Sequence, residues 1–297
     1  MTNSYFPALA AEELGFYKAE GVDAHIELLG PAPKAMSALR DGEVDAVAAA
    51  AHDTLFAFPA YKGARQVVAL SQGTPWLLVL RSDISANRGD LQAVKGLRIA
   101  AGRGPDAALK QLLLKAGIDP EKDNVRIGPI AITPGNSFGA SVAKALEVRE
   151  IDGFWANAVG SEIAVQRGVG KIVVDVRRGD GPPVAKHFTF ASLTTTDALI
   201  TRDFEVVAAT VRAIVKAQQT LKKDPDRAKE VGRRRFHPDA TNVISSIVER
   251  DLPFYDPVIY EEAIIATNKF AQSLGLLTSQ VPYEQVVDIR FRELWRI

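Results

Sequence analysis

The side chain best suited to hold a small anion lies in a glycine-flanked turn. Arg103 stands between Gly102 and Gly104, after an apolar segment ending at Ala101 and before a helix beginning at Pro105. Glycines ahead of a helix N-terminus leave backbone N–H groups open to an anion, and a guanidinium pairs bidentately with a carboxylate or sulfonate. The turn therefore predicts an anion site that includes Arg103 and Gly104.

Other polar and aromatic residues follow strand-like segments in the same way. His52 follows a run of small residues, and Trp155 ends another apolar segment, with Asn157 just beyond it. Because parallel strands bind ligands at their carboxyl ends, we expect these side chains to face a ligand, Trp155 as an apolar wall. The remaining predicted ligand-binding residues are Asn3, Ser4, Tyr5, Gln72, Thr74, Asn136 and Ser137.

Several of these positions also have a structural alternative. Residues such as Asn3 and Ser4 commonly cap a helix, here the one that begins near Pro7. His52 is a surface histidine in the alternative interpretation, and Trp155 is a core residue on the hinge side. The sequence leaves these alternatives open.

Several kinds of chemistry lack the residues they need. The chain contains no cysteine, which excludes disulfides, thiolate metal sites and a cysteine nucleophile. It has no H-x-x-x-H pattern, no dinucleotide or phosphate-loop motif, and no nucleophile-elbow context around Ser71 or Ser137. Lysine plus arginine equals aspartate plus glutamate at 36 each, so charge gives no reason to bind nucleic acid. We expect no catalytic residue, no metal, no cofactor and no nucleic-acid partner.

Hydrophobic periodicity predicts strands that alternate with helices. Val22–Leu28 alternates apolar and polar residues as a strand does, and Val44–Ala51 is a short apolar run typical of a buried strand. Asp203–Lys222 and Pro257–Leu274 form long helices of a C-terminal region expected to pack on the first lobe. This order predicts an α/β fold with mostly parallel sheets. The other predicted elements are strands 67–70, 97–101, 125–130, 151–156 and 172–176 and helices 8–18, 35–41, 105–116 and 137–149.

One pattern occurs twice in the chain. Ala38–Ala46 and Ala145–Gly153 each contain a helix end, a short turn and a strand start in the order β-branched residue, aspartate, small residue. Convergent helix-turn-strand sequence is one explanation. The other is a pair of similar Rossmann-like lobes that face each other across a ligand cleft.

Five segments, in order along nearly the whole chain, resemble the solute-binding proteins for sulfonates, nitrate, taurine and thiamine-pyrimidine precursors. The first, Leu9–Asp23, is similar to their opening A-x-E-x-G-F/Y-F/Y-K-x-E-G-L/V-D/E-V. The other four segments resemble the family elements A-L-x-x-G-E-V/I-D, D-L-K-G-K-x-I-A, V-D-A-x-x-W and N-P-E-x-A. In the same order, these segments are Ala38–Asp45, Asp90–Ala100 with a three-residue insertion, Ile151–Trp155 and Lys223–Ala228.

The resemblance implies a type II periplasmic-binding fold with two lobes, two crossovers and a hinged cleft. The crossovers are expected near Gln72–Leu80 and Phe188–Leu193, so lobe one is residues 1–76 with 194–297 and lobe two is 77–193. The family's W-E-P after the lobe-two strand reads Trp155-Ala156-Asn157 here, so the acidic pocket residue is absent.

The resemblance also implies a function and a location. We expect a monomeric periplasmic component of an ABC importer that binds a small organic anion, such as a sulfonate or aromatic carboxylate, and docks on permease subunits. The family's export signal and first strand are not recognisable before Pro7, so we expect the natural start to lie upstream. A cytoplasmic relative that acts as an enzyme of the decarboxylase, desulfinase or pyrimidine-synthesis type is the alternative.

Overall fold

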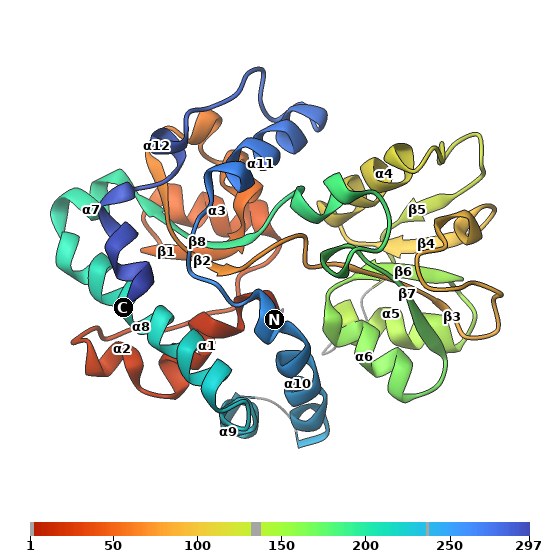
Figure 1. Ribbon diagram of the computed structural model, residues 1–297, viewed down its shortest axis with the longest axis horizontal. Coiled ribbons are helices and arrows are strands. Elements are labelled where there is room, and N and C mark those ends of the chain that lie inside the picture. Colours follow the sequence, from red (N-terminus) through yellow and green to blue (C-terminus); the bar gives the residue numbers. More distant parts are fainter. Residues whose placement is uncertain (1–2, 132–137, 236–237) are drawn as a thin grey trace. The chain divides into compact units, whose positions relative to one another are not determined.

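A computed structural model describes residues 3–131, 138–235 and 238–297 (Figure 1). The chain forms two compact units. Unit 1 contains residues 3–73 and Thr189–Ile297, and unit 2 contains Thr74–Phe188. Both changes of unit lie inside the segments expected to be crossovers. The α/β class of the fold is confirmed.

Unit 1 has a three-stranded sheet of β1 (Ala46–Ala50), β8 (Ala191–Thr196) and β2 (Ala64–Ser71), in that order. Strand β8 pairs antiparallel with both neighbours, so β1 and β2 run in the same direction. Their carboxyl ends and the start of β8 therefore meet at one edge of this sheet, the carboxyl edge of unit 1.

Helices cover the sheet of unit 1. The long helix α8 (Phe204–Lys223) buries one apolar face, including Val207, Val211 and Ile214, and packs on α1, α2 and β2. The C-terminal region thus packs on unit 1, as predicted. No helix in the described ranges is long and apolar enough to cross a membrane. The other helices of the unit are α1 (Phe6–Glu13), α2 (Phe16–Ala19), α3 (Ala32–Asp41), α7 (Asp197–Arg202), α9 (Arg227–Arg235), α10 (Pro238–Asp251), α11 (Glu261–Ser273) and α12 (Tyr283–Val286).

Unit 2 has a five-stranded sheet in the order β5-β4-β6-β3-β7. Strand β4 pairs parallel with β5 and β6, whereas β3 pairs antiparallel with β6 and β7. All strands except β3 therefore run the same way, and their carboxyl ends define the carboxyl edge of unit 2. The strands are β3 (Leu77–Arg81), β4 (Arg98–Ala101), β5 (Arg126–Gly128), β6 (Gly153–Ala156) and β7 (Gly170–Asp175).

The helices of unit 2 lie on both faces of its sheet. Helix α4 (Pro105–Lys115) covers one face, and α5 (Phe138–Glu147) and α6 (Ala158–Gln166) pack together on the other (Figure 1). The first turns of α5 and α6 meet at two glycines, because a Cβ on Gly139 would lie 2.8 Å from the backbone nitrogen of Gly160. Glycine at both positions lets the two helix backbones touch.

The predicted strand Val22–Leu28 is wrong. Residues 22–27 alternate in exposure as a strand does, but Leu28 is 75% exposed, no strand is formed there and the described residues supply no ladder partner. Period-two alternation reports a half-buried extended segment, whereas a strand also needs a neighbour for its N–H and C=O groups. Strands β3 and β8 were not predicted, because both overlap segments interpreted as crossovers.

The repeated sequence pattern has the same backbone at both places. Gly42 and Arg149 end their helices with φ of 76° and 59°. Glu43 N donates to Ala38 O and Glu150 N donates to Ala145 O, each at 2.9 Å. Both are Schellman-type helix ends, and a strand follows each one.

Candidate ligand site

Unit 2 gathers several chemistry-bearing residues at the carboxyl edge of its sheet. Arg103 follows β4, Trp155 and Asn157 lie at the end of β6, and Arg177 follows β7. The register pairs Ala101 of β4 with Trp155 of β6, so Arg103 is two residues beyond the strand position beside the indole. Sequence position alone had indicated this grouping for Arg103, Trp155 and Asn157.

Arg103 is an exposed cation at this edge. Its side chain is exposed, and it has no hydrogen bond or ion pair with any residue that the structure describes. The adjacent Gly104 has φ of 98°, a conformation that favours glycine, and a Cβ there would meet nothing within 4 Å. No carboxylate of the described residues pairs with the guanidinium, so a ligand would not have to displace one of them.

The backbone part of the predicted anion cradle is already occupied. Asp106 Oδ1 accepts the Gly104 N–H at 2.9 Å, so a carboxylate of the chain itself sits at the start of α4. A negative charge in the first turn satisfies the helix dipole that an external anion would otherwise use. The capacity of this turn to bind an anion therefore rests on Arg103 rather than on Gly104.

Trp155 is a buried aromatic residue with an unused donor. Its side chain is 1% exposed, and its ring lies 6.3 Å from that of Trp76 at 53°. Its Nε1 is buried and has no hydrogen-bond partner among the described residues. The ring thus has the packing expected of an apolar wall, but the indole N–H adds a hydrogen-bond donor to that apolar surface.

Two predicted ligand contacts in unit 2 have local structural partners. Asn157 Oδ1 accepts the Val159 N–H at 3.2 Å and caps α6. The Thr74 hydroxyl is buried and donates to Ala185 O at 2.7 Å. Each side chain has a structural use that the sequence interpretation did not include.

Arg177 is a residue that the sequence interpretation missed. Its side chain is fully buried, with its Nε 3.7 Å from Asp175 Oδ1, and Arg178 also approaches Asp175 at 3.4 Å. A buried guanidinium is costly without compensating charge, and Asp175 supplies that charge here. The available signal was an arginine pair directly after the apolar strand that ends at Asp175.

His52 lies at the carboxyl edge of unit 1 and is buried, which rules out the surface alternative. Its Nδ1 is 3.0 Å from Thr189 Oγ1, and its Nε2 is 3.5 Å from Asp53 Oδ1. Burial lowers the pKa of His52, with Asp53 opposing the shift, so the imidazole is neutral at pH 7. Burial raises the pKa of Asp53, with His52 and the Ala50 N–H opposing.

The other predicted residues of unit 1 differ in their surroundings. Gln72 Nε2 donates to the carbonyls of Asp256 and Val258 at 3.0 and 2.8 Å, so its amide hydrogens serve unit 1 itself. Ser4 Oγ is buried and has no hydrogen-bond partner within the described ranges. Tyr5 is half-buried ahead of α1, Asn3 belongs to the same 3-10 turn, and Asn136 and Ser137 lie outside the described residues.

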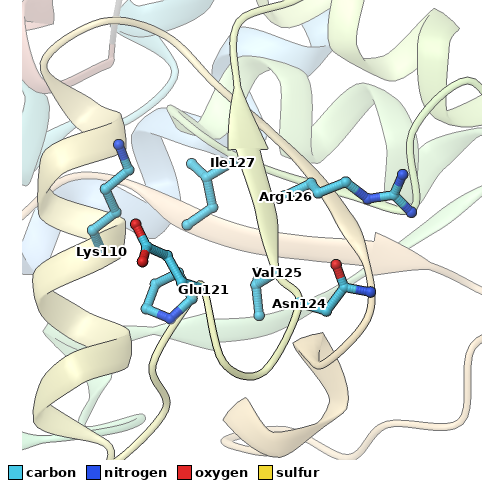
Figure 2. Close-up of a pocket in the computed structure, with 7 residues that line it drawn as sticks. Lys110, Glu121, Asn124, Val125, Arg126 and Ile127 are labelled. Atoms are coloured by element: carbon cyan, nitrogen blue, oxygen red, sulfur yellow. The ribbon is translucent and has the colours of Figure 1, made fainter.

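A surface pocket of about 290 Å³ lies away from the carboxyl edge of unit 2 (Figure 2). It opens between α4 and the edge strand β5, and it contains none of the predicted ligand-binding residues. Across residues 3–131, 138–235 and 238–297, no group of three His, Asp or Glu side chains has the arrangement of a metal site. The pocket is lined by Lys110, Pro120, Glu121, Asn124, Val125, Arg126 and Ile127.

Comparison with known proteins identifies relatives over most of the chain. The sequence profile described as NMT1/THI5 like matches residues 2–228. YtlA of Bacillus subtilis (strain 168), provisionally named a binding protein, is 23% identical over 308 aligned positions, which cover 97% of this chain and 85% of that protein.

Solved structures share the fold at low sequence identity. The periplasmic aliphatic sulphonate binding protein SsuA from Escherichia coli is 14% identical with a TM-score of 0.72, covering 96% of this chain and 88% of its own. The desulfurization enzyme DszB, solved with biphenyl-2-sulfinic acid, is 15% identical with a TM-score of 0.69, covering 98% and 95%. The same fold therefore occurs in a binding protein and in an enzyme.

Proposed function

Because the chain belongs to the NMT1/THI5-like family, we propose that it is the solute-binding component of an ABC importer and that it captures a small organic anion. The observation that carries the proposal is the exposed guanidinium of Arg103 at the carboxyl end of β4, which no described carboxylate neutralises. An arginine in this state offers charge and two parallel donors to a carboxylate or sulfonate.

The surroundings of β6 favour an anion as well. Ala156 stands where the related pattern W-E-P has its glutamate, and the neutral Asn157 follows it, so no carboxylate repels the ligand from that position. Arg177 adds a second guanidinium at the same edge, paired with Asp175. A ligand with one acidic group and a small organic body fits this balance of charge.

The proposed mechanism is binding with hinged closure and without chemistry. We take units 1 and 2 as the two lobes, joined at Gly73–Thr74 and Phe188–Thr189. A ligand that interacts more strongly with the closed state shifts the population toward that state by its differential affinity. The proposal further includes a monomer that works outside the cytoplasm and delivers its ligand to permease subunits.

A thermal-shift screen with analysis of products tests this function. The panel is ethanesulfonate, benzenesulfonate, benzoate, nitrate and a neutral pyrimidine. A ligand at about 100 times its Kd adds about 2.7 kcal/mol to the stability of the folded state. We expect an organic sulfonate or carboxylate to stabilise the protein and to be recovered unchanged.

Other results of the screen identify other functions. Consumption of a stabilising compound contradicts binding without chemistry and indicates an enzyme, as in DszB, which shares the fold. An enzyme of this kind would work without a cysteine nucleophile, because the chain has no cysteine. Stabilisation by the pyrimidine alone contradicts the anion class.

A further inference from the structure

The indoles of Trp155 and Trp295 differ in how their donors are used. Trp295 is 4% exposed, and its Nε1 donates to Val67 O at 2.9 Å. Trp155 is more deeply buried, yet its Nε1 has no acceptor among the described residues. An unsatisfied buried donor destabilises the folded state, because it has lost its hydrogen bonds to water. Native proteins rarely keep such a group without a partner such as water or a ligand.

The position of Trp155 points to a ligand as that partner. The residue pairs with Leu78 of β3 and Ala101 of β4, one position before the end of β6. Arg103, two residues after Ala101, is exposed and without a carboxylate among the described residues. A neutral donor and an exposed cation thus occur at the carboxyl ends of two adjacent parallel strands.

We propose that Trp155 Nε1 donates a hydrogen bond to an oxygen of the ligand's acidic group, and that Arg103 pairs with the same group. The inference rests on the proposed binding function and adds a specificity-determining residue to it. Trp155 then selects for a hydrogen-bond acceptor, a role that a purely apolar wall cannot have. The ring of Trp76, 6.3 Å from that of Trp155, provides apolar surface for the organic body beside that group.

The indole resonances of the intact protein test the inference without any substitution. The chain has three tryptophans, and labelling them with nitrogen-15 gives one indole N–H signal each in an NMR spectrum. Benzenesulfonate, ethanesulfonate and benzoate serve as probes. We expect saturation with a binding probe to move the Trp155 signal downfield, as a new charge-assisted hydrogen bond does, while the Trp295 signal stays in place.

Two matched variants measure the energetic role. Trp155→Phe keeps an aromatic ring and removes the donor, and we expect it to weaken binding of the probe about tenfold or more. Trp295→Phe removes a donor bonded within unit 1, and we expect probe affinity to stay within about twofold of wild type. Both variants also assign the two signals.

The outcomes separate this inference from the function beneath it. A probe that binds wild type while the Trp155 signal stays unmoved overturns the inference and leaves the binding function intact. A Trp155 signal showing contact with the same water before and after binding also overturns it, because the partner is then that water. Failure of all three probes to bind contradicts the proposed anion-binding function itself, and the inference falls with it.

Discussion

The two units use the same helix-turn-strand backbone for different purposes. In unit 1 it leads from α3 through Gly42 to Asp45 and β1, and in unit 2 from α5 through Arg149 to Asp152 and β6. The side chain of Asp45 is 83% exposed, whereas that of Asp152 is 13% exposed. The shared pattern therefore reports how the chain turns from helix to strand. Asp45 makes an exposed ion pair with Arg202 at 3.7 Å, whereas the aspartate of unit 2 has a larger energetic role because its partners surround a mostly buried carboxylate.

Those partners are two arginines of unit 2. Asp152 accepts from Arg98 Nε at 3.0 Å and from Arg81 Nη1 at 2.8 Å, and also from the Arg98 backbone N–H. Hydrogen bonding from Arg98 is the main cause that lowers the pKa of Asp152 to about 2. This cluster ties together the end of β3 and the starts of β4 and β6.

The carboxyl edges of the units differ in a similar way. The edge of unit 1 holds neutral groups bonded within the unit, such as His52 with Thr189 and Gln72 with Asp256 and Val258. The edge of unit 2 holds guanidinium groups and an indole donor without a described acceptor. Our proposal therefore places charge recognition in unit 2, and the predictions that follow test this division.

The largest expected effect is on the stability of unit 2. Asp152→Asn removes the ion pairs with Arg98 and Arg81, and a pKa shift from 3.8 to about 2 corresponds to about 2.5 kcal/mol. The matched change Asp45→Asn, at an exposed carboxylate, should alter stability by less than about 0.5 kcal/mol. Urea denaturation of both variants at pH 7 measures the difference, and equal losses would remove the contrast between the units.

The contribution of Asp152 to the free energy of unfolding should also depend on pH. Because the folded-state pKa of Asp152 is depressed, its contribution is present above pH 3.8 and is lost as pH falls toward about 2. The wild-type protein should therefore lose stability in that window more steeply than Asp152→Asn. If stability falls with acid as steeply in Asp152→Asn as in wild type, the arginines do not stabilise the fold through this carboxylate.

The second largest effect concerns ligand affinity. Arg103→Ala should weaken binding of an anionic ligand by about 10- to 100-fold, since it removes a charge-assisted pair at the edge of unit 2. Arg126→Ala is the matched control, because Arg126 is also exposed but lines the pocket between α4 and β5. Isothermal titration with the strongest binder of the panel measures both, and equal losses would indicate a diffuse charge effect.

A third prediction concerns the neutral edge of unit 1. Burial depresses the pKa of His52, so as pH falls below 6.5 the unfolded chain takes up a proton that the folded chain does not. Stability should then fall by up to about 1.4 kcal/mol per pH unit, and His52→Gln should remove this slope. The raised pKa of Asp53 acts oppositely, destabilising the fold as pH rises above 3.8.

The control for His52 is another histidine of unit 1. His25 has a side chain that is 81% exposed, so His25→Gln should leave the dependence of unfolding free energy on pH as in wild type. Chemical denaturation at several pH values between about 5 and 7 compares the three proteins. A slope that survives in His52→Gln would place the responsible proton elsewhere.

The sequence predicted those features of the fold and of the candidate site that depend on a local pattern of residues. The strands after Asp45 and Asp152 and the grouping of Arg103 with Trp155 follow from hydrophobic periodicity and from the direction of parallel strands. The failure at Val22–Leu28 arises because pairing depends on residues distant in sequence. Burial of Arg177 and the missing acceptor of Trp155 are tertiary properties, which a single local window does not contain.

The smallest expected effect tests whether the two helix ends are equivalent. Gly42→Ala places a Cβ at φ of 76° and should cost about 1 kcal/mol, since an L-residue is strained in the left-handed region. Arg149→Gly makes the reverse change at φ of 59° and should stabilise by about 0.5–1 kcal/mol, less a small amount for the exposed pair with Asp83. Opposite signs in urea denaturation would show that both turns obey the same backbone rule. Equal signs would mean that the shared hydrogen bonds do not make the turns energetically alike.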